Sequence, residues 1–131
     1  MWTAPSPAWN QTSEGNNAAD IQTAVIQVVN GTTNVPVRWG YTLLDGQSIK
    51  QFVFRIDGDD IGNVIGGERM VFNRYSTRFS VDSNSEFCTL IINKVTEREN
   101  ATFQSELRLA DGTQWAYNIR IEVTGIYFQQ S

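Results

Sequence analysis

The sequence predicts an all-β fold, either a β-sandwich or a small barrel, built from about nine strands. Apolar and polar residues alternate with a period of two along most of the chain, which is typical of strands with one face on a core and one in water. Turn dipeptides such as Asn30-Gly31 and Asp45-Gly46 separate the alternating runs. No stretch with helical periodicity is long enough to predict a helix of useful length.

Each expected strand begins and ends where the alternation or a turn signal places it. The second run is the clearest, because Val35, Val37 and Trp39 alternate with polar or small residues. Pro36 removes a backbone donor from this run, so we expect a bulge or the start of the strand there. Asp111-Gly112 joins the last two runs and predicts a hairpin between neighbouring strands. The expected strands cover residues 21–29, 35–43, 49–57, 61–65, 68–73, 77–82, 87–93, 101–109 and 114–123.

Length and composition fit one globular domain. The chain has 131 residues, 40% of them hydrophobic, and a net charge of −4, so it can bury a core without metals or disulfides. We expect a single domain over residues 1–131, with its core at about 21–124 and an irregular N-terminal edge segment at 1–20. The charge is not basic enough for a nucleic-acid partner, and no apolar run approaches the length of a membrane span. We therefore expect this domain to contact neither nucleic acid nor the membrane directly.

The absence of histidine excludes the commonest catalytic and metal-binding sites. Without it the chain cannot form a serine–histidine triad, a thiol–histidine pair or a zinc site of the usual ligands. Cys88 is the single cysteine, so no internal disulfide can form, and its parity with Leu90 and Ile92 predicts a buried thiol. We expect no enzymatic activity, no cofactor and no bound metal.

The acidic residues leave two alternatives open. Asp57, Asp59 and Asp60 follow the third expected strand and could form a calcium loop, since calcium binds oxygen ligands. A solvated turn is the preferred interpretation, because the loop length and the closing glutamate of a calcium loop are missing. Glu97 and Glu99 could in principle be the paired carboxylates of a glycosidase, but they belong to the turn after the seventh expected strand.

A more specific pattern lies between residues 78 and 105. Seven positions have the spacing Leu-x-Ile-x-x-Val-x-x-x-Asp-x-Ala-x-Tyr-x-Cys, namely Leu90, Ile92, Val95, Glu99, Ala101, Phe103 and Ser105, and Arg78-Phe79-Ser80 precedes them. This pattern resembles the variable-type immunoglobulin domain, and the likeness covers about residues 21–124. The resemblance implies an immunoglobulin-like V-set β-sandwich in which Arg78 and Glu99 form an ion pair across one end.

Departures from the immunoglobulin pattern define the expected core. Trp39 and Ser105 occupy the positions of the two disulfide cysteines, and Phe103 occupies that of the tyrosine corner. Phe52 or Phe54 replaces the tryptophan of strand C. Loss of such a disulfide typically costs about 2–5 kcal/mol. We expect Trp39 to fill the centre of the sandwich opposite the small Ser105 and to offset this loss.

Variable-type domains without the usual cysteines and tryptophan form a recognisable group. In this respect the chain resembles the membrane-distal domains of cnidarian allorecognition receptors. That resemblance implies an extracellular module of a cell-surface protein, which binds an identical or allelic domain on an opposing cell. Two alternatives stay open. One is a heterophilic immune-type receptor or ligand-binding domain, and the other is a structural or carbohydrate-binding β-sandwich.

By the resemblance, the strands expected at residues 49–57, 61–65, 101–109 and 114–123 correspond to strands C, C′, F and G of a variable-type domain. The outward face of the sheet that they form is the expected binding site, because variable-type domains commonly pair through it. Its mixed charges can be self-complementary across a two-fold axis. The turns after strands C and F, with Asp59, Asp60 and Asp111, are secondary candidates. By parity, the outward residues are Val53, Arg55, Gln104, Glu106, Arg108, Asn118, Arg120 and Glu122.

Three Asn-x-Thr sequons offer candidate glycosylation sites at Asn10, Asn30 and Asn100. All three fall in expected loops or edges, which suits glycosylation of a surface protein.

Overall fold

The computed structural model of the protein describes residues 23–125. The expected N-terminal edge segment, the first two residues of the expected first strand and the sequon at Asn10 lie outside the described residues. Among the described residues, no helix is long and apolar enough to cross a membrane. These residues form nine strands and two short 3₁₀ turns: β1 (Thr23–Val29), β2 (Thr33–Gly40), β3 (Ile49–Ile56), β4 (Asp59–Ile65), β5 (Glu68–Val71), η1 (Asn73–Tyr75), β6 (Phe79–Ser83), β7 (Phe87–Lys94), η2 (Glu97–Glu99), β8 (Thr102–Leu109) and β9 (Gln114–Thr124).

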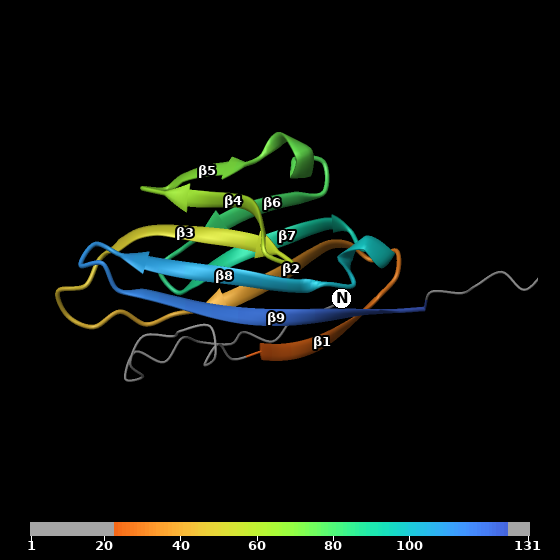
Figure 1. The fold of residues 1–131 in the computed structure, drawn as a ribbon, viewed down its shortest axis with the longest axis horizontal. Helices are drawn as coiled ribbons and strands as arrows, with labels where there is room; N and C mark the ends of the chain where they lie inside the picture. Colours follow the sequence, from red (N-terminus) through yellow and green to blue (C-terminus); the bar gives the residue numbers. More distant parts are fainter. Residues whose placement is uncertain (1–22, 126–131) are drawn as a thin grey trace, which may run out of the picture.

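The strands form two sheets (Figure 1). The larger sheet has the order β1-β9-β8-β3-β4-β5, and the smaller one has the order β2-β7-β6. β1 runs parallel to β9, whereas the other strand pairs of residues 23–125 are antiparallel. β4 and β5 extend the larger sheet beyond β3, where variable-type domains carry strands that constant-type domains lack. The predicted all-β sandwich of about nine strands is confirmed.

Two expected strands end two or more residues earlier in the structure than the alternation predicts. β2 ends at Gly40 rather than at residue 43. Tyr41 nevertheless stays buried, because its ring packs against Phe52 at a centroid distance of 5.3 Å. The alternation of buried and exposed residues therefore continues beyond the end of β2. β5 ends at Val71 rather than at residue 73, because the chain turns into η1 at Asn73.

Pro36 lies inside β2 without the expected bulge or strand start. The strand begins earlier, at Thr33, and Pro36 pairs with Ile91 of β7 in an unshifted register. Among the described strands β2 is an edge of the smaller sheet. A proline is tolerated on an edge strand because its missing N–H need not face a neighbour.

Trp39 is fully buried and joins the two sheets. Its Nε1 donates a hydrogen bond to the backbone carbonyl of Tyr117, 3.0 Å away on β9. Its ring meets Phe54 edge-on at a centroid distance of 5.9 Å. Because Phe54 also lies opposite Ser105 in the β3–β8 register, Phe54 rather than Phe52 stands at the level of the missing disulfide.

Ser105 is fully buried as well, and a cysteine reaches it across the sandwich. The Sγ atom of Cys88 lies 3.2 Å from the Oγ atom of Ser105. Cys88 pairs with Trp39 in the β2–β7 register, so the two side chains stand side by side on the smaller sheet. The predicted burial of Cys88 is confirmed, and this burial raises the pKa of its thiol.

An ion pair between Arg78 and Glu99 closes one end of the sandwich, as the resemblance implies. The Nη2 and Nε atoms of Arg78 donate to Glu99 Oε2 over 2.6 and 3.2 Å. Glu99 is buried, and its other oxygen accepts from the backbone N and the Oγ1 of Thr96 over 2.8 and 2.9 Å. Phe103, in the tyrosine-corner position, packs beside this end against Phe79 at 5.8 Å. The hydrogen bonds satisfy both oxygens of a carboxylate that is removed from water.

Candidate binding face

The outward side chains of β4, β3, β8 and β9 lie on one side of the larger sheet, which we call the outer face. In the register of β3 and β8, Val53 stands opposite Glu106, and Arg55 stands opposite Gln104. The same level continues onto β9, where Asn118 stands opposite Gln104. The outer face therefore brings together side chains from strands that are distant in the sequence.

A bulge in β4 decides which residue stands beside Arg55. Phe54 pairs with Gly62, whereas the next residue, Arg55, pairs with Asp60. Ile61 is the extra residue between them, and it is fully buried. An uninterrupted register would have set Ile61 beside Arg55. The bulge instead sets a carboxylate beside the guanidinium.

Four charges of alternating sign form a continuous ion-paired row on the outer face, which we call the charged row. Arg55 pairs with Asp60 at 2.8 Å and with Glu106 at 3.3 Å. The other carboxylate oxygen of Glu106 pairs with Nε of Arg108. Arg55 also donates to the side-chain oxygen of Gln104 over 3.0 Å. Charged hydrogen bonds of this kind hold long side chains in one arrangement.

Next to the charged row the outer face has a shallow hollow of about 160 Å³, which we call the central hollow. Val53 forms part of its lining and is 8% exposed, so its expected exposure on this face is wrong. The longer side chains around it shield it from water. The residues that line the hollow are Gln51, Val53, Arg55, Asp60, Gly62, Asn63, Phe72 and Arg108.

Exposed apolar side chains border the central hollow on the β4–β5 side. Met70 pairs with Asn63, and Ile65 pairs with Gln51, so both belong to the outward set. Met70 is 46% exposed, Ile65 49% and Phe72 38%. Sequence reasoning missed these three residues. The signal was available for Met70 and Phe72, because apolar residues of both parities occur in the expected strand 68–73.

The predicted outward residues of β9 divide into two groups. Asn118 joins the network, since its Oδ1 accepts from Gln104 Nε2 over 3.1 Å. Arg120 and Glu122 stand further along β9, opposite Val25 and Gln27 of β1. The ion pairs found within residues 23–125 include neither of them. The structure thus gathers the predicted residues of β3 and β8 with Asn118, and leaves Arg120 and Glu122 outside the row.

The acidic residues that were expected in turns have separate protein partners, and Asp59 and Asp60 begin β4 rather than lying in a turn. Asp57 accepts a hydrogen bond from the backbone N of Thr102 over 2.9 Å, and Asp59 pairs with Arg74 at 2.8 Å. Asp111 accepts from the backbone N of Thr113 over 2.8 Å, which lowers the pKa of Asp111. Over the described part of the chain, no three Cys, Asp or Glu side chains gather in a metal-binding cluster.

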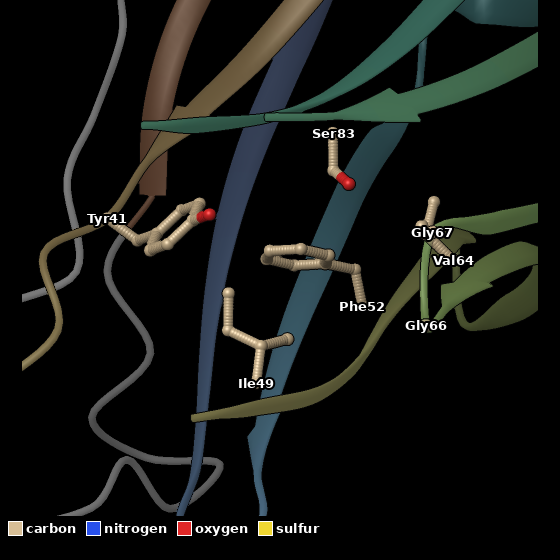
Figure 2. Close-up of a pocket in the computed structure, with 7 residues that line it drawn as sticks. All are labelled: Tyr41, Ile49, Phe52, Val64, Gly66, Gly67 and Ser83. Atoms are coloured by element: carbon tan, nitrogen blue, oxygen red, sulfur yellow. The ribbon is translucent and has the colours of Figure 1, made fainter. Parts of the chain in front are cut away.

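A second recess lies at the end of the sandwich where the β2–β3 loop approaches the β4–β5 turn. Its volume is about 160 Å³. Figure 2 shows the side chains of Ile49, Phe52 and Ser83 pointing into a common space, with Tyr41 on one side and Gly66-Gly67 on the other. The hydroxyl of Tyr41 donates to the backbone carbonyl of Asn84. None of the lining residues carries a charge at neutral pH, so the recess offers no acid–base pair.

Two sequons lie at one end of the sandwich. Asn30 is exposed in the β1–β2 turn, and its backbone N donates to the carbonyl of Thr124 over 2.7 Å. Asn100 is exposed after η2, and its Oδ1 accepts from the backbone N of Val123 over 3.0 Å. Both therefore stand next to the last residues of β9.

Comparison with known proteins defines the fold. No protein-family model matches the chain. No curated protein matches it by sequence. Among solved structures, the chain is similar to the first Ig-like domain from human CD48 antigen, with a TM-score of 0.61 and 16% sequence identity, over 91% of this chain and 97% of that chain. Together with the two sheets described above, this likeness establishes that the chain has the predicted immunoglobulin-like β-sandwich fold, here without an internal disulfide.

Proposed function

We propose that this chain is an extracellular recognition module of a cell-surface protein, and that it binds an identical or allelic copy on an opposing cell through the outer face. The observation that carries the proposal is the charged row beside the central hollow. An ordered set of mixed charges next to an apolar rim can discriminate between partners by complementarity. No cofactor takes part in such binding.

The composition of the outer face supports a protein partner. Phe72 and Met70 are of the residue types enriched in protein interfaces, and both are exposed beside the central hollow. Val53 provides an apolar floor, while Arg55 and Glu106 are already held by ion pairs. A face ordered before binding loses less side-chain entropy when a partner arrives.

The distribution of aromatic residues gives little support to the carbohydrate-binding alternative. Phe72 is the one exposed aromatic side chain among residues 23–125. A sugar-binding sheet face presents several exposed rings for stacking. The variable-type arrangement of β4 and β5 beside β3 agrees better with the resemblance to allorecognition domains, and with pairing through the sheet face.

Bead aggregation tests the proposed function. Beads of one colour carry this chain, and beads of a second colour carry an unrelated variable-type domain. We expect clumps that contain the first colour alone, because many weak contacts add up on a bead as they do on a cell. If the beads stay dispersed at high coating density, the homophilic proposal is wrong for this chain.

A matched pair of variants distinguishes the outer face from the loops. Met70→Lys places a charge on the border of the central hollow, and Leu44→Lys places one in the β2–β3 loop at a residue of similar exposure, 54% against 46%. We expect Met70→Lys to reduce clumping roughly tenfold and Leu44→Lys to leave it unchanged. The reverse result would assign recognition to the loops.

A further inference from the structure

The signs in the charged row are inverted when the row is read from its other end. Read from β4 to β8, the row runs Asp60, Arg55, Glu106, Arg108, which is negative, positive, negative, positive. Read from the other end, every position carries the opposite sign. A surface with this property is complementary to its own reversed copy.

Packing of two identical copies face to face produces this reversal. When the two-fold axis lies in the plane of contact and crosses the row at its middle, the first position meets the partner's fourth, and the second meets the partner's third. The middle of the row lies between Arg55 on β3 and Glu106 on β8. Val53 is next to both, because it pairs with Glu106 and is the neighbouring outward residue of Arg55 on β3. The axis therefore passes over the central hollow.

We propose that two copies of this chain pack outer face to outer face about a two-fold axis over Val53, so that Arg55 faces the partner's Glu106 and Asp60 faces the partner's Arg108. This inference rests on the proposed function, because it specifies how the homophilic contact is arranged. The two central hollows then meet, and Val53 approaches the partner's Val53. The exposed Phe72, beside Asp60, comes to the end of the partner's row where the partner's Arg108 can cover its ring.

The same row excludes neighbouring arrangements. A shift of one position in one direction sets Arg55 against the partner's Arg108 and Glu106 against the partner's Glu106. A shift in the other direction sets Asp60 against the partner's Glu106 and Arg55 against the partner's Arg55. Like charges at such short range oppose binding, so the shifted registers are disfavoured. Each charge in the row also keeps its partner within the chain, which lessens the cost of removing it from water. Binding then adds oppositely charged neighbours to a network that already exists.

Charge reversal on the two-colour beads tests the arrangement. R55E sets two carboxylates against each other across the contact, and E106R sets two guanidiniums. We expect each variant to lose self-clumping by at least about tenfold. Beads with R55E mixed with beads with E106R should clump again, since every reversed charge then meets its opposite. The double variant R55E/E106R should clump with itself, and it also restores the ion pair within the chain.

The outer positions and a mismatched mixture provide the controls. Beads with D60R and beads with R108D should each lose self-clumping, and a mixture of the two should clump again. R55E beads mixed with D60R beads should stay dispersed, although the charges of these variants change by as much as in the rescued mixture. General attraction between acidic and basic variants would make both mixtures clump. R69E and D82R reverse an exposed ion pair, at 3.6 Å between β5 and β6, that lies outside the row, and they should not affect clumping.

The outcomes separate the arrangement from the function. Rescue confined to the matched mixtures supports the two-fold contact. If the wild-type chain clumps but the single reversals clump as well, or the matched mixtures stay dispersed, the arrangement is wrong while homophilic recognition stands. If the wild-type chain never clumps, the proposed function fails and the arrangement with it. Thermal unfolding of each variant identifies any that is lost through misfolding, and R55E/E106R keeps the inner pair testable in that case.

Discussion

Cys88 and Ser105 touch across the sandwich, with Sγ and Oγ 3.2 Å apart and both side chains fully buried. Ser105 stands in the position of one cysteine of the immunoglobulin disulfide. The other half of the contact comes from β7 rather than from β2, where Trp39 stands in the second cysteine position. The chain thus keeps a contact between the two sheets at the level of the missing disulfide, from a different pair of strands.

Ser105→Cys should create a disulfide with Cys88. The two side chains already meet, and closing a loop between residues 17 apart should stabilise the fold by about 3 kcal/mol at most. Thiol titration of the unfolded protein should find no reactive thiol until a reducing agent is added, and the melting temperature should fall on reduction. Ser105→Ala provides the control without a second thiol. Two titratable thiols after air oxidation would show that the side chains cannot reach bonding geometry.

Trp39→Ala should lower the free energy of unfolding by about 3–5 kcal/mol, because it opens a large cavity and breaks the hydrogen bond to Tyr117. A second pair of variants isolates the hydrogen bond: Trp39→Phe removes it, whereas Trp115→Phe removes a buried Nε1 that has no hydrogen-bond partner among the described residues. Trp39→Phe should therefore cost more stability than Trp115→Phe. Denaturant unfolding of the three variants measures these differences, and equal losses for both Phe variants would contradict the role given to Trp39.

Glu99→Gln should lower the free energy of unfolding by about 3–5 kcal/mol, because it leaves the part-buried guanidinium of Arg78 without its countercharge. Asp59→Asn breaks the exposed pair with Arg74 and should change stability little, since water already screens that pair. Parallel denaturant titrations compare the two. If both changes had the same small effect, the Arg78–Glu99 pair would not hold the end of the sandwich.

The buried thiol predicts a loss of stability at alkaline pH. Burial raises the pKa of Cys88 in the folded state, so the unfolded chain releases the thiol proton first. The stabilising contribution is complete below the unfolded value of 9.0 and is lost as pH rises above it, by up to about 1.4 kcal/mol per pH unit. Urea unfolding between about pH 9 and pH 10 should show this slope, and Cys88→Ala should reduce it. An unchanged slope in Cys88→Ala would assign the effect to another group, such as Tyr41, whose pKa burial also raises.

Gly62→Ala should weaken self-binding by displacing β5. A Cβ atom at this position would lie 2.1 Å from the backbone carbonyl oxygen of Met70, so β4 and β5 could not keep their present spacing. The border of the central hollow would move with β5. The bead assay should report reduced clumping, and amide hydrogen exchange should be faster in β5 than in β8. Full clumping despite faster exchange in β5 would mean that β5 does not contribute to the contact.

Period-two alternation and turn dipeptides were sufficient to predict an all-β fold and most of its strands, because inward side chains repeat with the pleat. They left a sandwich and a small barrel open, and the resemblance to variable-type domains favoured the sandwich. The alternation failed at Tyr41, which is buried although it follows the end of β2. Packing against Phe52 keeps it inside, and a periodic pattern cannot separate burial in a strand from burial beside one. Pro36 was misread for a related reason, because whether a strand lies at the edge of a sheet depends on its neighbours.

The sequence by itself predicted which residues face the core along most strands, together with the burial of Cys88, and the resemblance to variable-type domains implied the pairing of Arg78 with Glu99. Only the tertiary structure decided which outward residues touch. The bulge at Ile61 sets Asp60 beside Arg55, and the pairing of β3 with β8 sets Glu106 within reach of the same guanidinium. These contacts depend on the register between strands, and residue order along a single strand contains no information about that register.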